Sequence, residues 1–318
     1  MKNLSVTIRE RLRCPICGGR LGPQGEELVC TNDPCGVAFP VVDGVPVLLN
    51  EKRSLFLIAD VIAGARSDQE RAGSAAGRAL RRLAPAMGRN VRAGANYRRL
   101  VTLLFDRAVK PRVLVIGGGV LGQGMEFLSS APGIELVETD VMLGPRTMLV
   151  CDAHDVPFED RVFDGVVAQA VLEHVADPYR CVEEVHRLLN PGGLVYAEVP
   201  FMQQVHMGRH DFTRFTYLGL RRLFRGFKEI ESGATCGPGM ALAWAYEYFL
   251  ASFFSSRRLR SVVRAFARVT SFYLKYCDYY LVRKAGALDA ASSIFFLGER
   301  AGSVMSDREL IRQYRGLS

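Results

Sequence analysis

The sequence lacks the long apolar runs that mark secretory signals and membrane-spanning helices. Its first residues, MKNLSVTIRERLRC, have no apolar core, so we expect no signal peptide there. The segment 240–254 is apolar and aromatic with Glu247 as its one charged residue, yet 15 residues are too few to cross a bilayer as a helix. The chain also lacks equal numbers of basic and acidic residues, with 41 Lys or Arg against 33 Asp or Glu. The net charge of +8 could favour nucleic acid, an anionic membrane or an acidic substrate, or reflect an arginine-rich composition alone.

The eight cysteines do not have the distribution of a disulfide scaffold. Four cluster near the N-terminus, and we expect the scattered four to be buried small apolar residues: Cys151, Cys181, Cys236 and Cys277. This pattern suits a reducing compartment, so we expect a cytoplasmic protein. With 318 residues, 49% of them hydrophobic and 23% charged, the chain is long enough for one full α/β domain with smaller attachments.

The clustered cysteines have the spacing of thiolate ligands to a metal. Cys14 and Cys17 are separated by two residues, and Cys30 and Cys35 by four. Four thiolates at these spacings fit a tetrahedral zinc ion with no open position, which is a structural and not a catalytic site. A segment of roughly 40 residues cannot build an adequate core alone, so the metal would supply much of its stability. The following FPVVDGVPVLLN, 39–50, predicts a β-hairpin.

Residues 10–50 resemble the small zinc-ribbon family that includes the activator subunit of eukaryotic tRNA and translation-factor methyltransferases. The resemblance implies a structural Zn2+ ion on the four cysteines. In one respect the sequence departs from the family, because the second cysteine pair usually encloses two residues and here Thr31-Asn32-Asp33-Pro34 lies between them. A ribbon that folds without metal is the alternative.

A basic segment, 51–95, follows the ribbon and carries nine Arg or Lys residues against four acidic ones. Its short apolar periodicities predict broken helices with mobile gaps, which make either a solvated connector or a lid over an active site. From Asn96 to Val109, apolar residues recur on one face and predict an amphipathic helix.

A glycine-rich loop follows the first predicted strand of the main domain. The apolar run RVLVI, 112–116, predicts a buried parallel strand that leads into GGGVLGQG. Gly117, Gly119 and Gly122 match the dinucleotide-binding fingerprint, so alone they indicate a nucleotide-like ligand at the end of the strand, NAD included. The second predicted strand ends at Asp140, whose carboxylate could accept hydrogen bonds from a ribose diol.

The stretch 152–200 carries a collinear series of motifs. They are, in order, Val156-Pro157-Phe158, the strand 163–169 opened by Phe-Asp, Leu172-Glu173-His174, the helix start Asp177-Pro178, and Asn190-Pro191-Gly192-Gly193 before a further strand. Their order and spacing resemble the second half of the class I S-adenosylmethionine-dependent methyltransferase domain, in the branch that acts mostly on small molecules. The resemblance implies an α/β fold with a doubly wound, Rossmann-like sheet of seven strands.

This resemblance also implies S-adenosylmethionine, in preference to NAD, as the cofactor. The resemblance implies that Asp152, at the end of a third strand, accepts a hydrogen bond from the adenine amino group, with Ala153 beside it. It also implies that Gln169 lines the methionine part of the cofactor. Many related enzymes have an acidic residue two positions before the first glycine to help hold the methionine ammonium group, and here that position is Val115. The ammonium would bind a backbone carbonyl of the loop or Gln169 instead. A cofactor-binding scaffold without activity is the alternative.

The loop after the fifth strand, 200–216, concentrates polar side chains where substrate meets the methyl donor in the resembled fold. Methyl transfer is an in-line displacement, so positioning supplies most of the acceleration, and a hydroxyl or amine acceptor must also lose a proton. We expect His206 or His210 to be the base. Asp211 could orient that base, and Arg214 could grip an anionic substrate. The alternative is that these residues only cap the next helix.

Two further strands, 227–235 and 290–300, are expected to pair antiparallel as the last strands of the sheet, which makes 237–289 a helical insertion. Within it, 240–283 combines apolar and aromatic residues with an arginine-rich helical face. Such a segment could cap the active site, bury against a second copy in a homodimer, or make a peripheral contact with an anionic membrane.

The sequence therefore predicts a zinc ribbon at 1–50, a linker or lid at 51–95, a methyltransferase domain at 96–300 and a tail at 301–318. We expect methyl transfer from S-adenosylmethionine to an oxygen or nitrogen of a small-molecule acceptor, such as a specialised metabolite or a sugar- or lipid-linked compound. No nucleic acid partner is expected, because the chain lacks the Asn/Asp-Pro-Pro-Tyr motif that amino-directed enzymes on macromolecules often carry. A macromolecular acceptor docked by the ribbon is the alternative.

Overall fold

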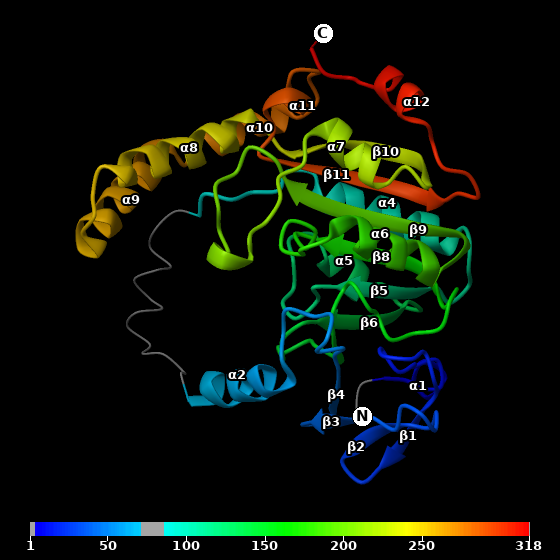
Figure 1. Cartoon of the computed structure of the whole chain (residues 1–318). Coiled ribbons are helices and arrows are strands. Elements are labelled where there is room, and N and C mark those ends of the chain that lie inside the picture. Colours follow the sequence, from blue (N-terminus) through cyan, green and yellow to red (C-terminus); the bar gives the residue numbers. More distant parts are fainter. Residues whose placement is uncertain (1–3, 71–85, 318) are drawn as a thin grey trace.

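The computed structural model describes residues 4–70 and 86–317, and within them one sheet of eleven strands organises the fold (Figure 1). The strands lie in the order β1-β2-β3-β4-β7-β6-β5-β8-β9-β11-β10. The seven from β5 onward are Arg112–Ile116 (β5), Glu135–Asp140 (β6), Leu149–Cys151 (β7), Phe163–Gln169 (β8), Leu189–Pro200 (β9), Phe227–Cys236 (β10) and Ser293–Arg300 (β11). Strands β5 to β9 pair in parallel, whereas β11 is antiparallel to both of its neighbours. The predicted doubly wound α/β sheet is confirmed, and four further strands extend it.

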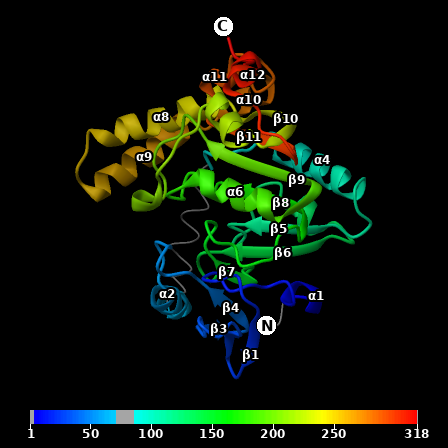
Figure 2. The ribbon, with the colours of Figure 1, turned by 45° about the vertical axis from the view of Figure 1, so that its right-hand side comes forward.

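The four additional strands come from the N-terminal segment. They are β1 (Leu21–Gln24), β2 (Glu27–Cys30), β3 (Ala38–Val42) and β4 (Val45–Leu48), preceded by the short helix α1 (Val6–Arg9). Strands β3 and β4 form the predicted hairpin, because Asp43 and Gly44 take φ values of 51° and 85°, as a tight two-residue hairpin turn requires. Strand β4 then pairs in parallel with β7, with Val47 opposite Val150, so the N-terminal segment continues the main sheet (Figure 2).

Two apolar clusters on opposite faces of the sheet form the core. Successive residues of β5 alternate between them. Leu114 packs in the cluster that contains α6 (Pro178–Leu188), whereas Val113 and Val115 pack in the cluster that contains α4 (Ala93–Phe105). Both faces of the parallel strands are therefore covered, which explains why their sequences are continuous apolar runs.

Helix α4 is shifted toward the N-terminus relative to its predicted bounds. It begins at Ala93 because Oδ1 of Asn90 accepts hydrogen bonds from the backbone N–H groups of Arg92 and Ala93, at 3.1 and 2.8 Å. It ends at Phe105, whereas the prediction extended to Val109. Val109 is 90% exposed and has no core to pack against, so no burial of apolar surface would stabilise another helical turn.

Helix α6 begins as predicted. Asp177 accepts hydrogen bonds from two backbone N–H groups of the first turn, and Pro178 occupies the first helical position. The helix ends at Leu188, and β9 begins at Leu189, so the Asn190-Pro-Gly-Gly sequence predicted to precede the strand is part of it.

Between β10 and β11 the chain forms a group of helices that extends away from the sheet (Figures 1 and 2). They are α8 (Pro238–Ser252), α9 (Arg257–Ser271), α10 (Leu274–Leu281) and α11 (Ala287–Ala290), and we refer to α8 and α9 as the helical arm. Asp278 accepts hydrogen bonds from the backbone N–H groups of Gly237, Gly239 and Met240 at 2.8–3.0 Å, which fixes the first turn of α8. No helix within the described ranges is long and apolar enough to cross a membrane.

The remaining helices are α2 (Ile58–Glu70), α5 (Glu126–Ser129), the 3-10 turn η1 (Gly208–His210), α7 (Tyr217–Leu223) and α12 (Asp307–Arg312). Thr216 caps α7 by accepting a hydrogen bond from the backbone N–H of Gly219 at 3.1 Å. The predicted linker 51–95 falls partly on residues 71–85, outside the described residues, and its described parts contain α2 and the beginning of α4.

Candidate functional site

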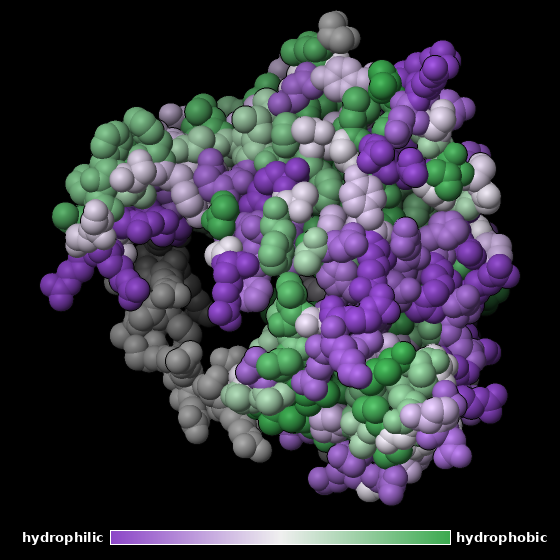
Figure 3. Space-filling model, in the orientation of Figure 1, coloured by the Kyte–Doolittle hydropathy of each residue, from purple (hydrophilic) through white to green (hydrophobic). Residues whose placement is uncertain are grey.

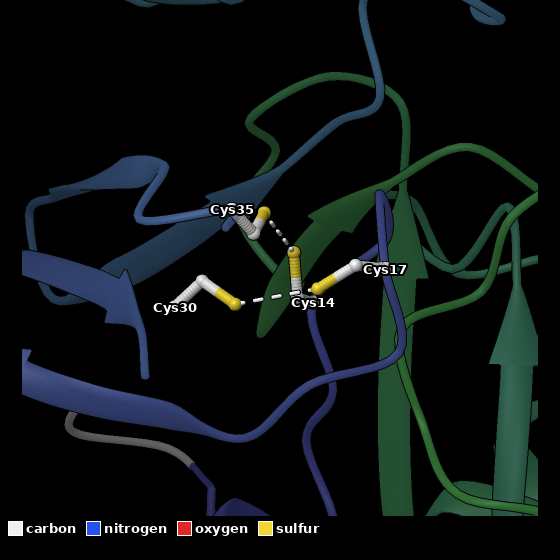
Figure 4. A group of neighbouring side chains, drawn as sticks. All are labelled: Cys14, Cys17, Cys30 and Cys35. Carbon is white, nitrogen blue, oxygen red and sulfur yellow. Dashed lines mark hydrogen bonds between the residues drawn. The ribbon is translucent and has the colours of Figure 1, made fainter. Parts of the chain in front are cut away.

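Four cysteine sulfurs converge among the N-terminal strands (Figure 4). Sγ of Cys14 lies 3.8 Å from Sγ of Cys35, Sγ of Cys17 lies 3.4 Å from Sγ of Cys30, and all four atoms lie within 4.8 Å of one another. A zinc ion bound tetrahedrally at about 2.3 Å from each sulfur separates the sulfurs by about 3.8 Å. The four cysteines therefore fit a structural zinc ion, which would supply folding energy to this segment.

The lengthened second cysteine pair is accommodated by a tight turn. The backbone N–H of Cys35 donates to the carbonyl oxygen of Asn32 at 2.9 Å, and Gly36 takes a φ of 54°. The side chain of Asn32 also donates to Sγ of Cys17 at 3.5 Å. This hydrogen bond, together with one from the backbone of Gly19, lowers the pKa of Cys17 to about 6. A lowered pKa favours the thiolate that zinc binds.

The glycine-rich loop lies at the carboxyl ends of β5 and β6, against Asp140. The backbone N–H of Gly119 donates to Oδ2 of Asp140 at 3.0 Å, and that of Met142 donates to Oδ1 at 3.1 Å. A Cβ atom on Gly119 would lie 2.7 Å from the same Oδ2, so this close approach requires glycine. Ligands of doubly wound sheets bind at this edge, where the strand order reverses between β5 and β8.

Asp152, which follows β7, is 4% exposed and already has partners within the chain. Its Oδ2 accepts from Oγ of Ser54 at 2.5 Å, and its Oδ1 accepts from the backbone N–H of His154 at 2.9 Å and lies 2.5 Å from the ring Nδ1. Burial opposes ionisation, but these hydrogen bonds outweigh it and lower the pKa of Asp152. The residue predicted to bind adenine, with buried Ala153 beside it, is thus held by the segment that follows β4. No sequence pattern pairs Ser54 with Asp152.

The position without an acidic residue is part of the core, and a buried glutamate lies instead beside Gln169. Val115 is 1% exposed and packs in the α4 cluster, so its side chain is part of the core. Glu198, in β9, is 5% exposed, and its Oε2 accepts hydrogen bonds from Gln169 at 2.9 Å and from Asn90 at 2.7 Å. Burial raises the pKa of Glu198. The signal that could have found it is an acidic residue near the end of an otherwise apolar strand, GLVYAEVP.

A cavity of about 270 Å³ opens beside Glu198, at the carboxyl ends of β8 and β9. Its lining includes Asn90, Gln169, Glu173, Glu198, Gln203 and His206. Ala170, directly after β8, takes a φ of 55°, and its N–H donates to the carbonyl oxygen of Glu198 at 2.9 Å. A non-glycine residue held in this conformation is strained, and such strain gathers at functional sites. The cavity connects Gln169 with the polar loop 200–216.

His206 is the histidine of the polar loop that lines this cavity. Its backbone N–H donates to Oδ2 of Asp211 at 2.9 Å, and its ring Nδ1 lies 3.4 Å from the same oxygen. Arg214 pairs with both oxygens of Asp211 and lowers its pKa to about 2. Arg214 also donates to the carbonyl oxygen of Gln203 at 2.8 Å, so its side chain links the beginning of the polar loop to its end.

His210 lies outside the described lining of the cavity. Its ring stacks on Phe56, with the ring centroids 5.7 Å apart, and its carbonyl oxygen accepts a hydrogen bond from Nδ1 of His174 at 2.8 Å. The two histidines predicted as candidate bases thus occupy different positions, and only His206 of the two faces the cavity.

Glu173 lies between His174 and His206. Its side chain is fully buried, and neither carboxylate oxygen has a hydrogen-bond partner among the described residues. Its Oε1 lies 3.6 Å from Nε2 of His174 and 3.8 Å from Nε2 of His206. Burial raises the pKa of Glu173 to about 8. In the sequence, Glu173 is only part of a Leu-Glu-His motif, and nothing there indicates that its carboxyl group would be buried without a hydrogen-bond partner.

Comparison with known proteins divides the chain into two matched parts. Residues 10–44 match the model of a family described as Trm112p-like protein, and residues 129–197 match a methyltransferase domain. A UPF0434 protein of Serratia proteamaculans is 49% identical over 53 residues, which are 16% of this chain and 85% of that protein. A demethylmenaquinone methyltransferase of Symbiobacterium thermophilum is 31% identical over 115 residues, which are 34% of this chain and 42% of that protein. The chain thus spans less than half of the length of that relative.

Among solved structures, phosphoethanolamine N-methyltransferase 2 of Haemonchus contortus, in complex with S-adenosyl-L-methionine, is similar with a TM-score of 0.44 and 18% sequence identity. The similarity covers 65% of this chain and 52% of that chain. The two family matches fall on the parts of the chain that carry the four cysteines and the motif series after Asp152.

Proposed function

Because the chain joins an S-adenosylmethionine-dependent methyltransferase domain to an N-terminal segment that belongs to the UPF0434 family, we propose that it transfers a methyl group to an oxygen or nitrogen of a small-molecule acceptor. The observation that carries the proposal is the cavity in which Gln169, from the predicted cofactor edge, and His206, from the polar loop, line the same space. A cavity of about 270 Å³ suits a small acceptor or one end of a longer one. The name of the demethylmenaquinone methyltransferase relative supports a small-molecule acceptor.

In this proposal S-adenosylmethionine supplies the methyl group, and the residues of the chain position it against the acceptor. The loop 117–122 and Asp140 hold the ribose, Asp152 and Ala153 border the adenine, and Gln169 borders the methionine part.

His206 activates the acceptor, and Asp211 fixes the orientation of the His206 ring through Nδ1. His210 supports the arrangement through its carbonyl oxygen. Since the displacement is in line, holding the acceptor at a fixed distance and angle supplies most of the acceleration.

Calorimetric titration followed by a turnover assay tests the proposal. We expect binding of S-adenosylmethionine and S-adenosylhomocysteine but not of NAD, and release of S-adenosylhomocysteine that depends on an acceptor from a metabolite extract or on a short-chain demethylmenaquinone. Gly119→Ala should abolish cofactor binding, because the new Cβ would displace Asp140. Gly302→Ala is the matched control, since a Cβ there meets open space. Binding of NAD alone, or no acceptor-dependent turnover with any extract, would contradict the proposal.

We further propose that the helical arm makes a peripheral contact with an anionic membrane surface, which would give the enzyme access to a lipid-linked acceptor. Five apolar residues of α9 and the residues just after it recur at helical spacing and are each more than half exposed: Leu259, Val262, Phe266, Val269 and Tyr273. A surface helix normally buries such a stripe. Apolar residues cover the upper side of the arm in Figure 3, and hydrophilic residues gather along its lower side.

The charge near this stripe favours anionic lipid over a second copy of the chain. Arg257, Arg258 and Arg260 are exposed at the first turn of α9, and the whole chain carries a net charge of +8. A helix with an apolar face and flanking arginines has the composition of helices that lie in the membrane interface. Two like-charged arms would instead repel each other in a dimer.

Co-sedimentation with vesicles tests the membrane contact. The protein should sediment with phosphatidylglycerol vesicles and less with phosphatidylcholine vesicles, and Phe266→Glu should weaken sedimentation. Val304→Glu, at a valine that is 64% exposed outside the arm, is the control. Equal sedimentation with both lipids, or a dimer in solution that Phe266→Glu dissociates, would overturn the proposed membrane contact.

The unpaired thiols of the chain suit a reducing compartment, so we propose that the protein lies on the cytoplasmic side of that membrane.

A further inference from the structure

We propose that Glu173, His174 and His206 bind a divalent transition-metal ion at the polar end of the cavity. One carboxylate oxygen and one imidazole nitrogen from each histidine lie within 4.8 Å of one another. Two histidines with one carboxylate form a ligand set that proteins use to hold a metal ion while leaving coordination positions open. The binding itself does not depend on the proposed methyl transfer, but the role assigned to the metal below rests on it.

The second nitrogen of each ring supports this ligand set. Nδ1 of His174 donates to the carbonyl oxygen of His210 at 2.8 Å, so its Nε2 carries the lone pair and lies 3.6 Å from the carboxylate of Glu173. Nδ1 of His206 lies 3.4 Å from Oδ2 of Asp211 and 3.5 Å from a guanidinium nitrogen of Arg214, while its Nε2 lies 3.8 Å from the same Glu173 oxygen. Metal-binding histidines are usually held by a carbonyl or carboxylate behind the ring, as His174 is by the carbonyl oxygen of His210 and as Asp211 can hold His206.

The carboxyl group of Glu173, which is buried without a hydrogen-bond partner, is the observation that points to a cation. Its side chain is 0% exposed, and neither oxygen has a hydrogen-bond partner among the residues that the structure describes. A buried carboxyl group without a hydrogen-bond partner costs free energy whether it is neutral or ionised, whereas a bound metal ion would satisfy its ionised form. The backbone of the polar loop keeps Glu173 in place, because the N–H groups of Phe212 and Thr213 donate to its carbonyl oxygen at 2.8 and 3.2 Å.

The distances suit a transition metal after a small closure of the cluster. A metal ion at about 2.0–2.2 Å from nitrogen and oxygen ligands brings the ligand atoms to roughly 3–3.5 Å from one another, slightly closer than the 3.6 and 3.8 Å observed. Imidazole and carboxylate ligands favour ions such as Mn2+, Fe2+ and Zn2+ over soft ions that prefer thiolates.

Bound there, the ion would give His206 a specific way to activate the acceptor. Because His206 lines the cavity, the open coordination positions would face the space assigned to the acceptor. A metal ion lowers the pKa of a bound hydroxyl group, so the acceptor oxygen would be deprotonated more easily without a separate base. Direct proton removal by an unmetallated His206 is the competing explanation, and in that case His174 has no part in activation.

Titration of the full chain with MnCl2, followed by the electron paramagnetic resonance signal of free Mn2+, tests the site. Mn2+ is the probe because it binds thiolates poorly and should ignore the four-cysteine cluster. The wild type should bind one Mn2+ per chain, and Glu173→Gln, His174→Gln and His206→Gln, each of which removes a ligand, should each weaken binding by more than about 100-fold, the upper end of the loss caused by residues behind a ligand. His210→Ala is the matched control, because its backbone carbonyl remains to hold His174.

Two outcomes would overturn the proposal: no Mn2+ binding by the wild type, or wild-type affinity in both His174→Gln and His206→Gln. Binding of S-adenosylhomocysteine and the melting temperature of each variant show whether the variant is folded, and His206→Gln, whose ring is partly exposed, covers a failure of Glu173→Gln to fold. No acceptor is present in the titration, so a failure of the proposed methyl transfer would leave this result standing, and a failure of metal binding would leave methyl transfer standing.

Discussion

The four-cysteine cluster and the cluster of Glu173, His174 and His206 both bring their ligand atoms within 4.8 Å of one another, but their surroundings differ. The cysteines come from one short segment, 14–35, and four like ligands leave a metal no open position. The second cluster joins the end of β8 to the polar loop after β9, mixes nitrogen with oxygen, and borders a cavity. A closed set of four like ligands suits a role in stability, whereas a mixed set with open positions beside a cavity suits the role in chemistry that we propose for it.

Removing the closed site should have the largest effect. In Cys17→Ser/Cys30→Ser, zinc binding should be lost, and because structural zinc contributes about 10 kcal/mol or more to small metal-bound segments, the N-terminal strands should unfold. We expect the melting temperature to fall by roughly 10 °C or more, since β4 pairs with β7 and transmits the loss to the main sheet. Thermal unfolding monitored by circular dichroism, with zinc content measured in parallel, checks this.

The control for the double variant is Cys277→Ser. The expectation that Cys277 is buried is wrong, because it is exposed on α10, outside the cluster, so its replacement should leave both zinc content and melting temperature unchanged. A double variant that lost its zinc and kept its melting temperature would show that the cysteine cluster does not stabilise the fold, and the contrast between the two sites would fail.

Changing the open site should affect activity and spare stability. His206→Gln should lower kcat by about 10²- to 10⁴-fold, the usual contribution of a group that activates a nucleophile. Its melting temperature should stay near that of the wild type, because the ring is 28% exposed at the cavity and is not part of the core. Steady-state turnover and thermal unfolding of the same preparation check both statements, with His186→Gln as the control histidine. A fall in melting temperature as large as that of the cysteine variant would show that the open site also stabilises the fold, and the proposed difference between the two sites would be wrong.

The closed site and most of the sheet could be predicted from the sequence because local rules determine them. Two short cysteine pairs lie around hairpin strands, the Asp43-Gly44 turn fixes its own register, and strands buried on both faces are apolar throughout. The open site could not be predicted in the same way. Whether the carboxylate of Glu173 is buried depends on how the loop 200–216 packs over it, and the pairing of β4 with β7 joins segments about a hundred residues apart in the chain. Contacts between distant segments leave no periodic signal.

The support behind the open site should matter less than its ligands. Asp211→Asn keeps an oxygen near Nδ1 of His206 but removes the charge and weakens the pairing with Arg214. We expect Mn2+ affinity to fall by about 10- to 100-fold, as for other residues behind a metal ligand, while binding of S-adenosylhomocysteine stays unchanged. Asp160→Asn, at an exposed aspartate paired with Arg187, is the control. Unchanged Mn2+ affinity in Asp211→Asn would mean that the loop, and not this carboxylate, orients the ring.

The smallest expected effect is that of removing the hydrogen bond between Ser54, in the N-terminal region, and Asp152, at the edge of the sheet where we propose that the cofactor binds. Ser54 follows β4, and its half-buried hydroxyl donates to Oδ2 of the buried Asp152 at 2.5 Å. Ser54→Ala should lower the free energy of unfolding by about 1–2 kcal/mol, the usual cost of removing one hydrogen bond to a buried charged group. The affinity for S-adenosylmethionine should change by less than about threefold, because His154 still holds the other oxygen of Asp152.

Chemical denaturation and calorimetric titration of Ser54→Ala, compared with Ser252→Ala at the exposed end of α8, separate the two quantities. If stability were unchanged and cofactor affinity fell by more than about tenfold, Ser54 would itself border the cofactor. The N-terminal region would then contribute to the chemistry of the main domain, and its role could not be restricted to stability. If instead both quantities followed the expectation, Ser54 would affect the cofactor edge only through the position of Asp152, and the pairing of β4 with β7 would remain the main coupling between the two regions.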